Sequence, residues 1–350
     1  MKQFNTIFLK IAFVSITICL ASACSNDFEL DNLDETLYVR HKNADMPAYI
    51  RGNSSEKVFL ITLHGGPGGT GLGFTGKAFD AIENQFGLVY FDQRGSGNSQ
   101  GHYSEDDVSI DLMAEDVLAL VKVLQRKFGS DSRFFLLGGS WGGTLGTATL
   151  LKNQSFFKGW IEVAGANNPA GLYDWYIETF TTTANNQIAL GNSVDFWESV
   201  LELVAQVGAV NNLDDFLDLN GKAFEAEEKL FEDGFIDAVE NGIGGNETFF
   251  TYNFLTRGWN NSQIASILDN QGLFQTTDFT SQLSEIRIPS LFISGRYDMV
   301  VPMVSAQTAF DAIGSTSKEL EVFERSGHGP MFSEPELFAE KVIEFMNAHK

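Results

Sequence analysis

The chain has 350 residues, of which 43% are hydrophobic and 13% aromatic, and its formal charge at pH 7 is −23. This composition is typical of a folded protein and excludes an extensively disordered one, while the length fits either two domains or one α/β domain with an insertion. The acidic residues are spread along the chain and form no tail, so the charge argues against a nucleic-acid partner and favours cationic ligands.

Residues 1–23 have the parts of a secretory signal peptide. Two lysines precede an apolar run at residues 11–20, which is too short to cross a membrane comfortably. Cys24 follows directly after small residues, as in the lipobox of bacterial lipoproteins, and cleavage there would leave it as the only cysteine, so no disulfide could form. We therefore predict an exported protein of the bacterial cell envelope, anchored to a membrane by lipid on Cys24. A plain cleaved signal, giving a soluble periplasmic or secreted protein, and an uncleaved anchor are the alternatives.

Strand-like and helix-like segments alternate through much of the remaining chain. Short apolar runs are typical of strands that are covered on both faces of a parallel sheet. They occur at residues 58–63, 87–91, 134–137, 160–165, 289–294 and 320–323, after a strand pair at 37–40 and 48–51. Helical spacing of apolar residues occurs at 108–128, 304–313 and 335–348. This alternation predicts an α/β protein with a mostly parallel central sheet flanked by helices.

One of the strand-like runs leads into a glycine-rich turn that contains a serine. Residues 138–142 are Gly-Gly-Ser-Trp-Gly, and a helix-like segment follows them. The pattern Gly-x-Ser-x-Gly is that of a nucleophile elbow, a strained turn that lifts a serine hydroxyl above a sheet. Ser140 is therefore a candidate nucleophile, although a glycine-rich turn around a serine is by itself usually only a turn.

Two further motifs precede this turn. Residues 64–68, His-Gly-Gly-Pro-Gly, follow one strand, and residues 92–97, Asp-Gln-Arg-Gly-Ser-Gly, follow the next. The three motifs in this order resemble the proline iminopeptidase (prolyl aminopeptidase) branch of the α/β-hydrolase superfamily. The resemblance covers about residues 37–150 and resumes near residue 288. It implies an α/β-hydrolase core, which we assign to residues 37–166 and 283–350, with a helical cap at 167–282 and a polar tether at 24–36.

Several charged residues near these motifs have structural interpretations. In the family the loop at residues 92–97 is structural, and we predict an ion pair between Asp92 and Arg94 that holds it. His64 is expected to position the glycine loop that follows it by hydrogen bonding. The acids at the start of the 108–128 helix, Asp116 among them, complement the helix dipole and are interpreted as a solvated face.

Two candidate partners for Ser140 follow the last two strands. Asp298 comes shortly after the strand at residues 289–294, and His328 comes directly after the final one. The order serine, aspartate, histidine is the order of α/β-hydrolase catalytic triads. A serine hydroxyl is a weak nucleophile until a base accepts its proton, so His328 is predicted as the base and Asp298 as the group that orients it. The fold further implies an oxyanion hole made by the backbone N–H groups of Gly66 and Trp141.

The sequence therefore predicts a serine hydrolase that forms an acyl-enzyme on a short peptide or another small acyl substrate. It predicts no cofactor and no metal, because no cluster of ligand-type residues is visible. The resemblance implies release of an N-terminal proline or other residue, with cap glutamates binding the free amine, for which Glu198 and Glu247 are candidates. An esterase or amidase of the same fold and a non-catalytic, peptide-binding surface lipoprotein are the alternatives. Epoxide hydrolases and dehalogenases are disfavoured because their elbow carries aspartate where this chain has Ser140, and no pattern indicates an oligomeric state.

Overall fold

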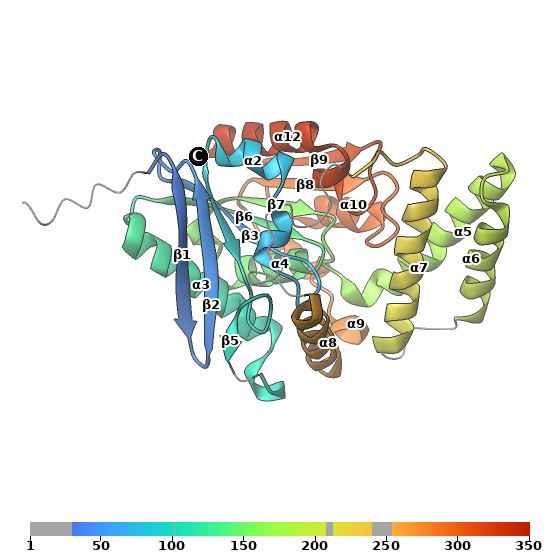
Figure 1. The fold of residues 1–350 in the computed structure, drawn as a ribbon, viewed down its shortest axis with the longest axis horizontal. Helices are drawn as coiled ribbons and strands as arrows, with labels where there is room; N and C mark the ends of the chain where they lie inside the picture. Colours follow the sequence, from blue (N-terminus) through green and yellow to red (C-terminus); the bar gives the residue numbers. More distant parts are fainter. Residues whose placement is uncertain (1–29, 102, 208–212, 240–253) are drawn as a thin grey trace, which may run out of the picture.

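The computed structural model describes residues 30–101, 103–207, 213–239 and 254–350, so the predicted signal peptide and Cys24 lie outside the described residues. Its strands are β1 Leu33–His41, β2 Ala44–Gly52, β3 Val58–Leu63, β4 Gly87–Phe91, β5 Gln100–Gly101, β6 Arg133–Gly139, β7 Phe157–Val163, β8 Ser290–Gly295 and β9 Lys318–Phe323. They form one sheet in the order β1-β2-β4-β3-β6-β7-β8-β9, with β5 paired to β2 (Figure 1). The pairs from β4 to β9 are parallel, and those of β1, β2 and β5 are antiparallel. The predicted mostly parallel α/β architecture is confirmed.

The antiparallel edge of the sheet begins earlier in the chain than the sequence predicted. The β1–β2 register runs from Leu33 opposite Gly52 to His41 opposite Ala44, so both strands are nine residues long. The last residues of the predicted tether therefore belong to β1. Leu33 is buried against the core, which gives the strand an apolar reason to start there despite its acidic neighbours.

Helices cover both faces of the sheet. The helices are α2 Lys77–Glu83, α3 Ile110–Phe128, α4 Trp141–Asn153, α5 Leu172–Leu190, α6 Val194–Gln206, α7 Leu213–Glu232, α8 Phe254–Asn270, α9 Leu273–Thr276, α10 Met303–Ala312, α11 Pro330–Ser333 and α12 Pro335–His349, with short 3₁₀ segments between some of them. Apolar residues of α2 and α12 pack on one face, and those of α3, α4 and α10 pack on the other. Within the described residues, no helix combines the length and the apolar character needed to cross a membrane.

The helices between β7 and β8 fall into two groups. Residues of α5, α6 and α7 form a core of their own around Tyr176, Trp197 and Leu230. Apolar residues of α8 and α9, such as Ile264 and Leu273, instead join the core of the sheet. Figure 1 shows α5 to α7 standing out from one end of the sheet while α8 lies beside it. The name cap is used below for α5–α7.

Candidate active site

Ser140 lies on the turn between β6 and α4, near the middle of the sheet. Its backbone has φ 55° and ψ −122°, a conformation that is strained for a residue with a side chain. The turn is held because the Ser140 N–H donates to Val163 O at 3.1 Å, while Gly143 N and Ala166 N donate to Ser140 O at 2.8 and 3.1 Å. A Cβ at Gly142 would collide with the carbonyl oxygen of Leu63, so the absence of a side chain two residues after the serine allows α4 to approach β3. The predicted elbow geometry is confirmed.

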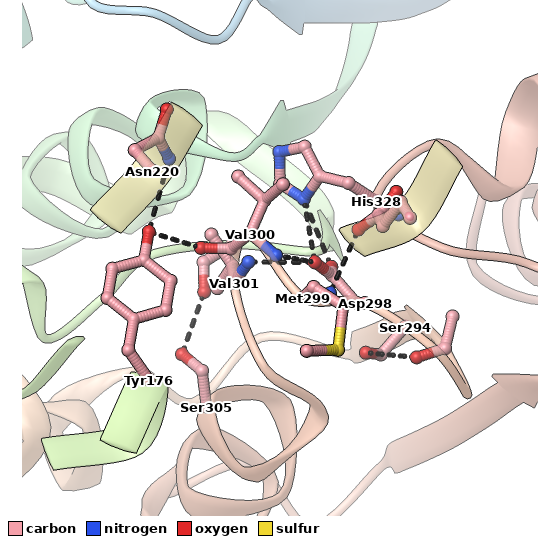
Figure 2. Close-up of polar contacts among 12 residues, drawn as sticks. Tyr176, Asn220, Ser294, Asp298, Met299, Val300, Val301, Ser305 and His328 are labelled. Atoms are coloured by element: carbon pink, nitrogen blue, oxygen red, sulfur yellow. Dashed lines mark hydrogen bonds and ion pairs between the residues drawn. The ribbon is translucent and has the colours of Figure 1, made fainter. Parts of the chain in front are cut away.

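Asp298 and His328 lie on the loops that follow β8 and β9, two neighbouring parallel strands. Figure 2 shows the imidazole of His328 turned towards the Asp298 carboxylate, with Nδ1 at 3.1 Å from Oδ1 and 3.0 Å from Oδ2. The carboxylate is buried and also accepts hydrogen bonds from Val300 N at 2.9 Å and Val301 N at 2.7 Å. Three donors therefore fix the carboxylate in place, and it in turn fixes one nitrogen of the imidazole ring.

The three predicted triad residues all follow the carboxyl ends of strands in the parallel part of the sheet, because Ser140 follows β6 and the other two follow β8 and β9. Among the described residues, the structure brings Asp298 and His328 into hydrogen-bond contact but records no hydrogen bond from the Ser140 hydroxyl to His328. Hydrogen bonds of this kind are often long without substrate and shorten in the reacting complex. The full triad stays a prediction.

The environment of His328 changes its basicity. Burial lowers the pKa of His328, but the charge of Asp298, the hydrogen bond to it and the charge of Glu227 outweigh burial, so the pKa lies above its ordinary value. A base with a raised pKa binds a proton more strongly and is blocked by protonation at a correspondingly higher pH. A reaction that needs neutral His328 should therefore lose activity as the pH falls through this raised pKa.

The predicted oxyanion donors flank Ser140. Trp141 is the first residue of α4, where a backbone N–H has no acceptor within the helix. The glycine loop passes close to the serine, since a Cβ built on Gly65 would lie 3.1 Å from the Ser140 Cβ. Gly66, with φ 123°, follows in a conformation that favours glycine. The oxyanion role of Gly66 and Trp141 stays a prediction.

Residues 58–335 match the family model described as the alpha/beta hydrolase fold. The chain belongs to the α/β-hydrolase family. It is 25% identical over 318 residues to a probable aminopeptidase YbaC of Bacillus subtilis, covering 88% of this chain and 94% of that protein. It is 28% identical to a proline iminopeptidase of Saccharolobus solfataricus, covering 82% and 84% of the two chains. The solved structure of an esterase from Exiguobacterium antarcticum shares the fold with a TM-score of 0.57 at 18% identity, covering 90% of this chain and all of that one. The predicted resemblance to the proline iminopeptidase branch of the family is thus confirmed.

In this α/β hydrolase, Gln93 links all three sequence motifs. Its side-chain amide donates to His64 O at 2.9 Å, and its Oε1 accepts from the Trp141 indole at 2.9 Å. His64 Nδ1 lies 2.8 Å from Gly65 O, and its Nε2 lies 3.3 Å from Gln93 N. The expected positioning of the glycine loop by hydrogen bonds of His64 is confirmed. The buried network ties the loop to the turn at Ser140.

The predicted ion pair between Asp92 and Arg94 is wrong. The Asp92 carboxylate instead accepts hydrogen bonds from Thr70 Oγ1, Gly71 N and Asn98 N at 2.8–2.9 Å. These donors belong to the same loop and to the preceding glycine loop, so they satisfy the buried carboxylate without a cation. Asp92 therefore joins the two loops by hydrogen bonds, which the spacing of the two charged residues could not reveal.

Arg94 pairs with Asp116 of α3, which corrects the interpretation of this acid as part of a solvated face. Arg94 Nε and Nη2 donate to the two Asp116 oxygens at 2.8 and 2.7 Å, and both side chains are 1% exposed. His41 Nδ1 lies 2.6 Å from the same carboxylate. Asp116 therefore lies on the inward face of α3. Because both charges are buried, removal of either one would leave the other without a partner in the core.

Sequence reasoning missed Glu227, a residue of α7. Its carboxylate accepts hydrogen bonds from Met299 N and His328 N, each at 2.9 Å, so it lies beside the Asp298–His328 pair. A signal for it existed, because Glu227 comes one turn after Ala223 and is next to Ala226 on the buried stripe of the helix. The earlier candidates do not match it: Glu198 is exposed on α6, and residue 247 lies outside the described residues.

Proposed function

We propose that this α/β hydrolase is a serine hydrolase that acts through an acyl-enzyme at Ser140. The observation that carries the proposal is the pairing of Asp298 and His328 at 3.0 Å on the same edge of the sheet as a serine held at φ 55°. Strained backbone at a serine and an acid–histidine pair with a perturbed pKa are both features that cluster at functional sites, and here they lie at the same edge of one sheet.

The proposed mechanism follows from these positions. His328 Nε2 accepts the hydroxyl proton as Ser140 Oγ attacks the substrate carbonyl, and Asp298 stabilises the resulting imidazolium through Nδ1. The N–H groups of Gly66 and Trp141 hold the oxyanion, and loss of one such donor costs about 3 kcal/mol in comparable enzymes. The imidazolium then protonates the leaving group. Water attacks the acyl-enzyme with His328 again as base and restores the hydroxyl of Ser140.

We further propose that the hydrolase is an aminopeptidase that releases proline or another residue from the amino terminus of short peptides. Two relatives that match over more than four fifths of their length carry the names aminopeptidase and proline iminopeptidase. The net charge of −23 favours a substrate with a free, positively charged amine. In the cap, Glu227 of α7 adds a carboxyl group beside the Asp298–His328 pair, which favours the approach of a cationic substrate.

A second candidate function is that of an esterase or amidase for an apolar acyl group. It is favoured by Phe224 of α7, whose ring centroid lies 6.2 Å from that of His328 although the side chain is 52% exposed. An exposed aromatic ring beside the proposed base offers an apolar contact to a substrate. The solved esterase of the same fold adds only the fold to this argument.

The experiment uses purified protein and a fluorophosphonate probe. We expect wild-type protein to be labelled and Ser140→Ala to be unlabelled and inactive. Absence of labelling on folded wild-type protein would refute the hydrolase proposal and favour a peptide-binding protein without activity. Turnover of prolyl and other aminoacyl naphthylamides supports the aminopeptidase. Turnover of short acyl nitrophenyl esters without any aminoacyl turnover refutes the aminopeptidase and supports the esterase.

A further inference from the structure

We propose that Glu227 is a positioning residue that clamps the two loops carrying Asp298 and His328, so that the cap forms part of the catalytic apparatus. The inference rests on the proposed function for its kinetic test but not for its spectroscopic one. It assigns to the cap a role besides covering the site, namely to hold Asp298 and His328 at hydrogen-bond distance from each other.

The clamp consists of hydrogen bonds from both loops to one carboxylate. Glu227 Oε1 accepts from Met299 N, the residue directly after Asp298, at 2.9 Å. Glu227 Oε2 accepts from the backbone N–H of His328 itself at 2.9 Å, with Oε1 at 3.1 Å from the same nitrogen. Both oxygens therefore accept from backbone N–H groups. One group belongs to His328, the proposed base, and the other belongs to the residue next to Asp298, the proposed acid.

The residue before His328 allows this close approach. A Cβ built on Gly327 would collide with the carboxylate of Glu227, so a side chain at this position would displace that carboxylate from its backbone donors. The absence of a side chain at Gly327 thus has a specific consequence: the cap carboxylate reaches the backbone of the histidine loop directly.

A second contact fastens the same loop to the cap. Tyr176 of α5 donates its hydroxyl to Val300 O at 2.8 Å, and Asn220 of α7 donates to that hydroxyl at 3.1 Å (Figure 2). Met299 and Val300 are at most 3% exposed and belong to the apolar core of α5–α7. The loop that carries Asp298 is therefore embedded in the cap, and movement of α7 would move this loop.

The charge of Glu227 also reaches the proposed base. The titratable groups near it are Asp298, His328 and Tyr176. Burial, followed by the charge of Asp298, raises the pKa of Glu227 to about 7, while the charge of His328 and the two backbone hydrogen bonds oppose the rise. The ionised form of Glu227 contributes to the raised pKa of His328. It would stabilise the imidazolium that forms when Ser140 loses its proton.

The contacts favour positioning over direct binding of a substrate amine. An amine ligand would have to share a carboxylate whose two oxygens already accept backbone N–H groups, which leaves fewer lone pairs for the protons of an amine. The two roles also differ in their kinetic effects. A positioning residue acts on every substrate through kcat, while an amine ligand acts on the KM of substrates that carry an amine.

The experiment compares Glu227→Gln and Glu227→Ala with Glu228→Gln in the full chain. Glu228 is the neighbouring, exposed acid of α7, so its variant removes the same charge without touching the loops. We expect Glu227→Ala to lower kcat at least about tenfold on ester and aminoacyl substrates alike, with KM nearly unchanged, because misplaced catalytic groups act on the chemical step. Glu227→Gln keeps an accepting oxygen and should lose less, and Glu228→Gln should match wild type.

The pH dependence separates positioning from a simple loss of stability. In Glu227→Gln, the acid limb of the kcat/KM profile should move to lower pH, since His328 loses a neighbouring negative charge. The same downward shift should appear in an NMR titration of the His328 ring, a readout that needs no turnover. The NMR titration therefore tests the proposal even if wild-type protein proves inert, which would refute only the hydrolase assignment.

Two results would overturn the proposal. One is a Glu227→Gln protein whose His328 titration and kinetics match those of Glu228→Gln. The other is a rise in KM confined to aminoacyl substrates with an unchanged kcat, which would make Glu227 a ligand of the amine. Should Glu227→Ala fail to fold, the isosteric Glu227→Gln variant decides both points.

Discussion

Replacement of Glu162 by glutamine should change how the stability of the hydrolase depends on pH. Glu162 lies on β7 and is 1% exposed. Its Oε1 accepts a hydrogen bond from Asn167 Nδ2 at 2.9 Å, and the Trp160 indole N–H interacts with the same carboxyl without standard hydrogen-bond geometry. Burial raises the pKa of this carboxyl to about 7, and the interactions with Asn167 and Trp160 oppose the rise only in part. The ionised form is therefore poorly accommodated in the folded protein.

The magnitude follows from the difference between the folded and unfolded proteins. The pKa of Glu162 rises from the ordinary value of 4.5 to about 7 on folding. A pKa raised on folding contributes stability that is fully present below the unfolded pKa and is lost as the pH rises through the folded pKa. Each tenfold change in the ionisation equilibrium corresponds to about 1.4 kcal/mol, so the full loss is about 3 kcal/mol. Glutamine has no charge to form and should show no such loss.

The assay is urea unfolding of wild type and Glu162→Gln at pH 5 and pH 8.5. We expect the free energy of unfolding of wild type to fall by about 2.5 kcal/mol relative to the variant between the two pH values, because a part of the full loss has already occurred at pH 5. Glu198→Gln, at an exposed position of α6, is the control and should follow wild type. Parallel pH dependence of wild type and Glu162→Gln would refute the reasoning, because it would mean that the carboxylate is solvated or paired when ionised.

Three further predictions concern the proposed acid Asp298, the buried pair of Arg94 and Asp116, and the predicted lipid anchor at Cys24. Asp298→Asn should lower kcat about 10⁴-fold, since an amide presents a donor where His328 Nδ1–H needs an acceptor; retention of a tenth of the activity would contradict the assigned role. Asp116→Ala should lower the free energy of unfolding by about 3–5 kcal/mol, measured in urea, because Arg94 stays buried without its carboxylate; wild-type stability would contradict this. Cys24→Ser should move the expressed protein from the detergent phase to the aqueous phase in a Triton X-114 partition, and partition of wild type into the aqueous phase would refute the lipid anchor.

Much of the core could be predicted because the responsible patterns are local. A strand that is buried on both faces must be apolar throughout, and so β3, β4 and β8 are visible as short runs. The turn at Ser140 is visible because strand and helix approach so closely there that a side chain would collide at residues 138 and 142, where the chain has glycine. The order of serine, aspartate and histidine after successive strands then indicates Asp298 as the candidate acid and His328 as the candidate base.

The partners of the charged residues could not be predicted, because they depend on which elements meet in space. Asp92 and Arg94 are two residues apart, yet one binds the glycine loop and the other binds α3. Glu227 contacts loops that lie 72 and 101 residues further along the chain. The inserted helices likewise divide between two cores, although their sequences share the same helical character.

The sequence by itself determined most strands of the sheet and the serine turn, and it indicated Asp298 and His328 as the candidate acid and base, because each depends on a pattern within one strand or turn. Only the tertiary structure decided which buried charges pair and that a cap carboxylate binds the loops of the acid and the base. Burial makes an unpaired charge costly, so Arg94 and Asp116, both buried, pair with each other. Which partner a buried charge finds is set by the packing of distant helices, and no local pattern encodes that packing.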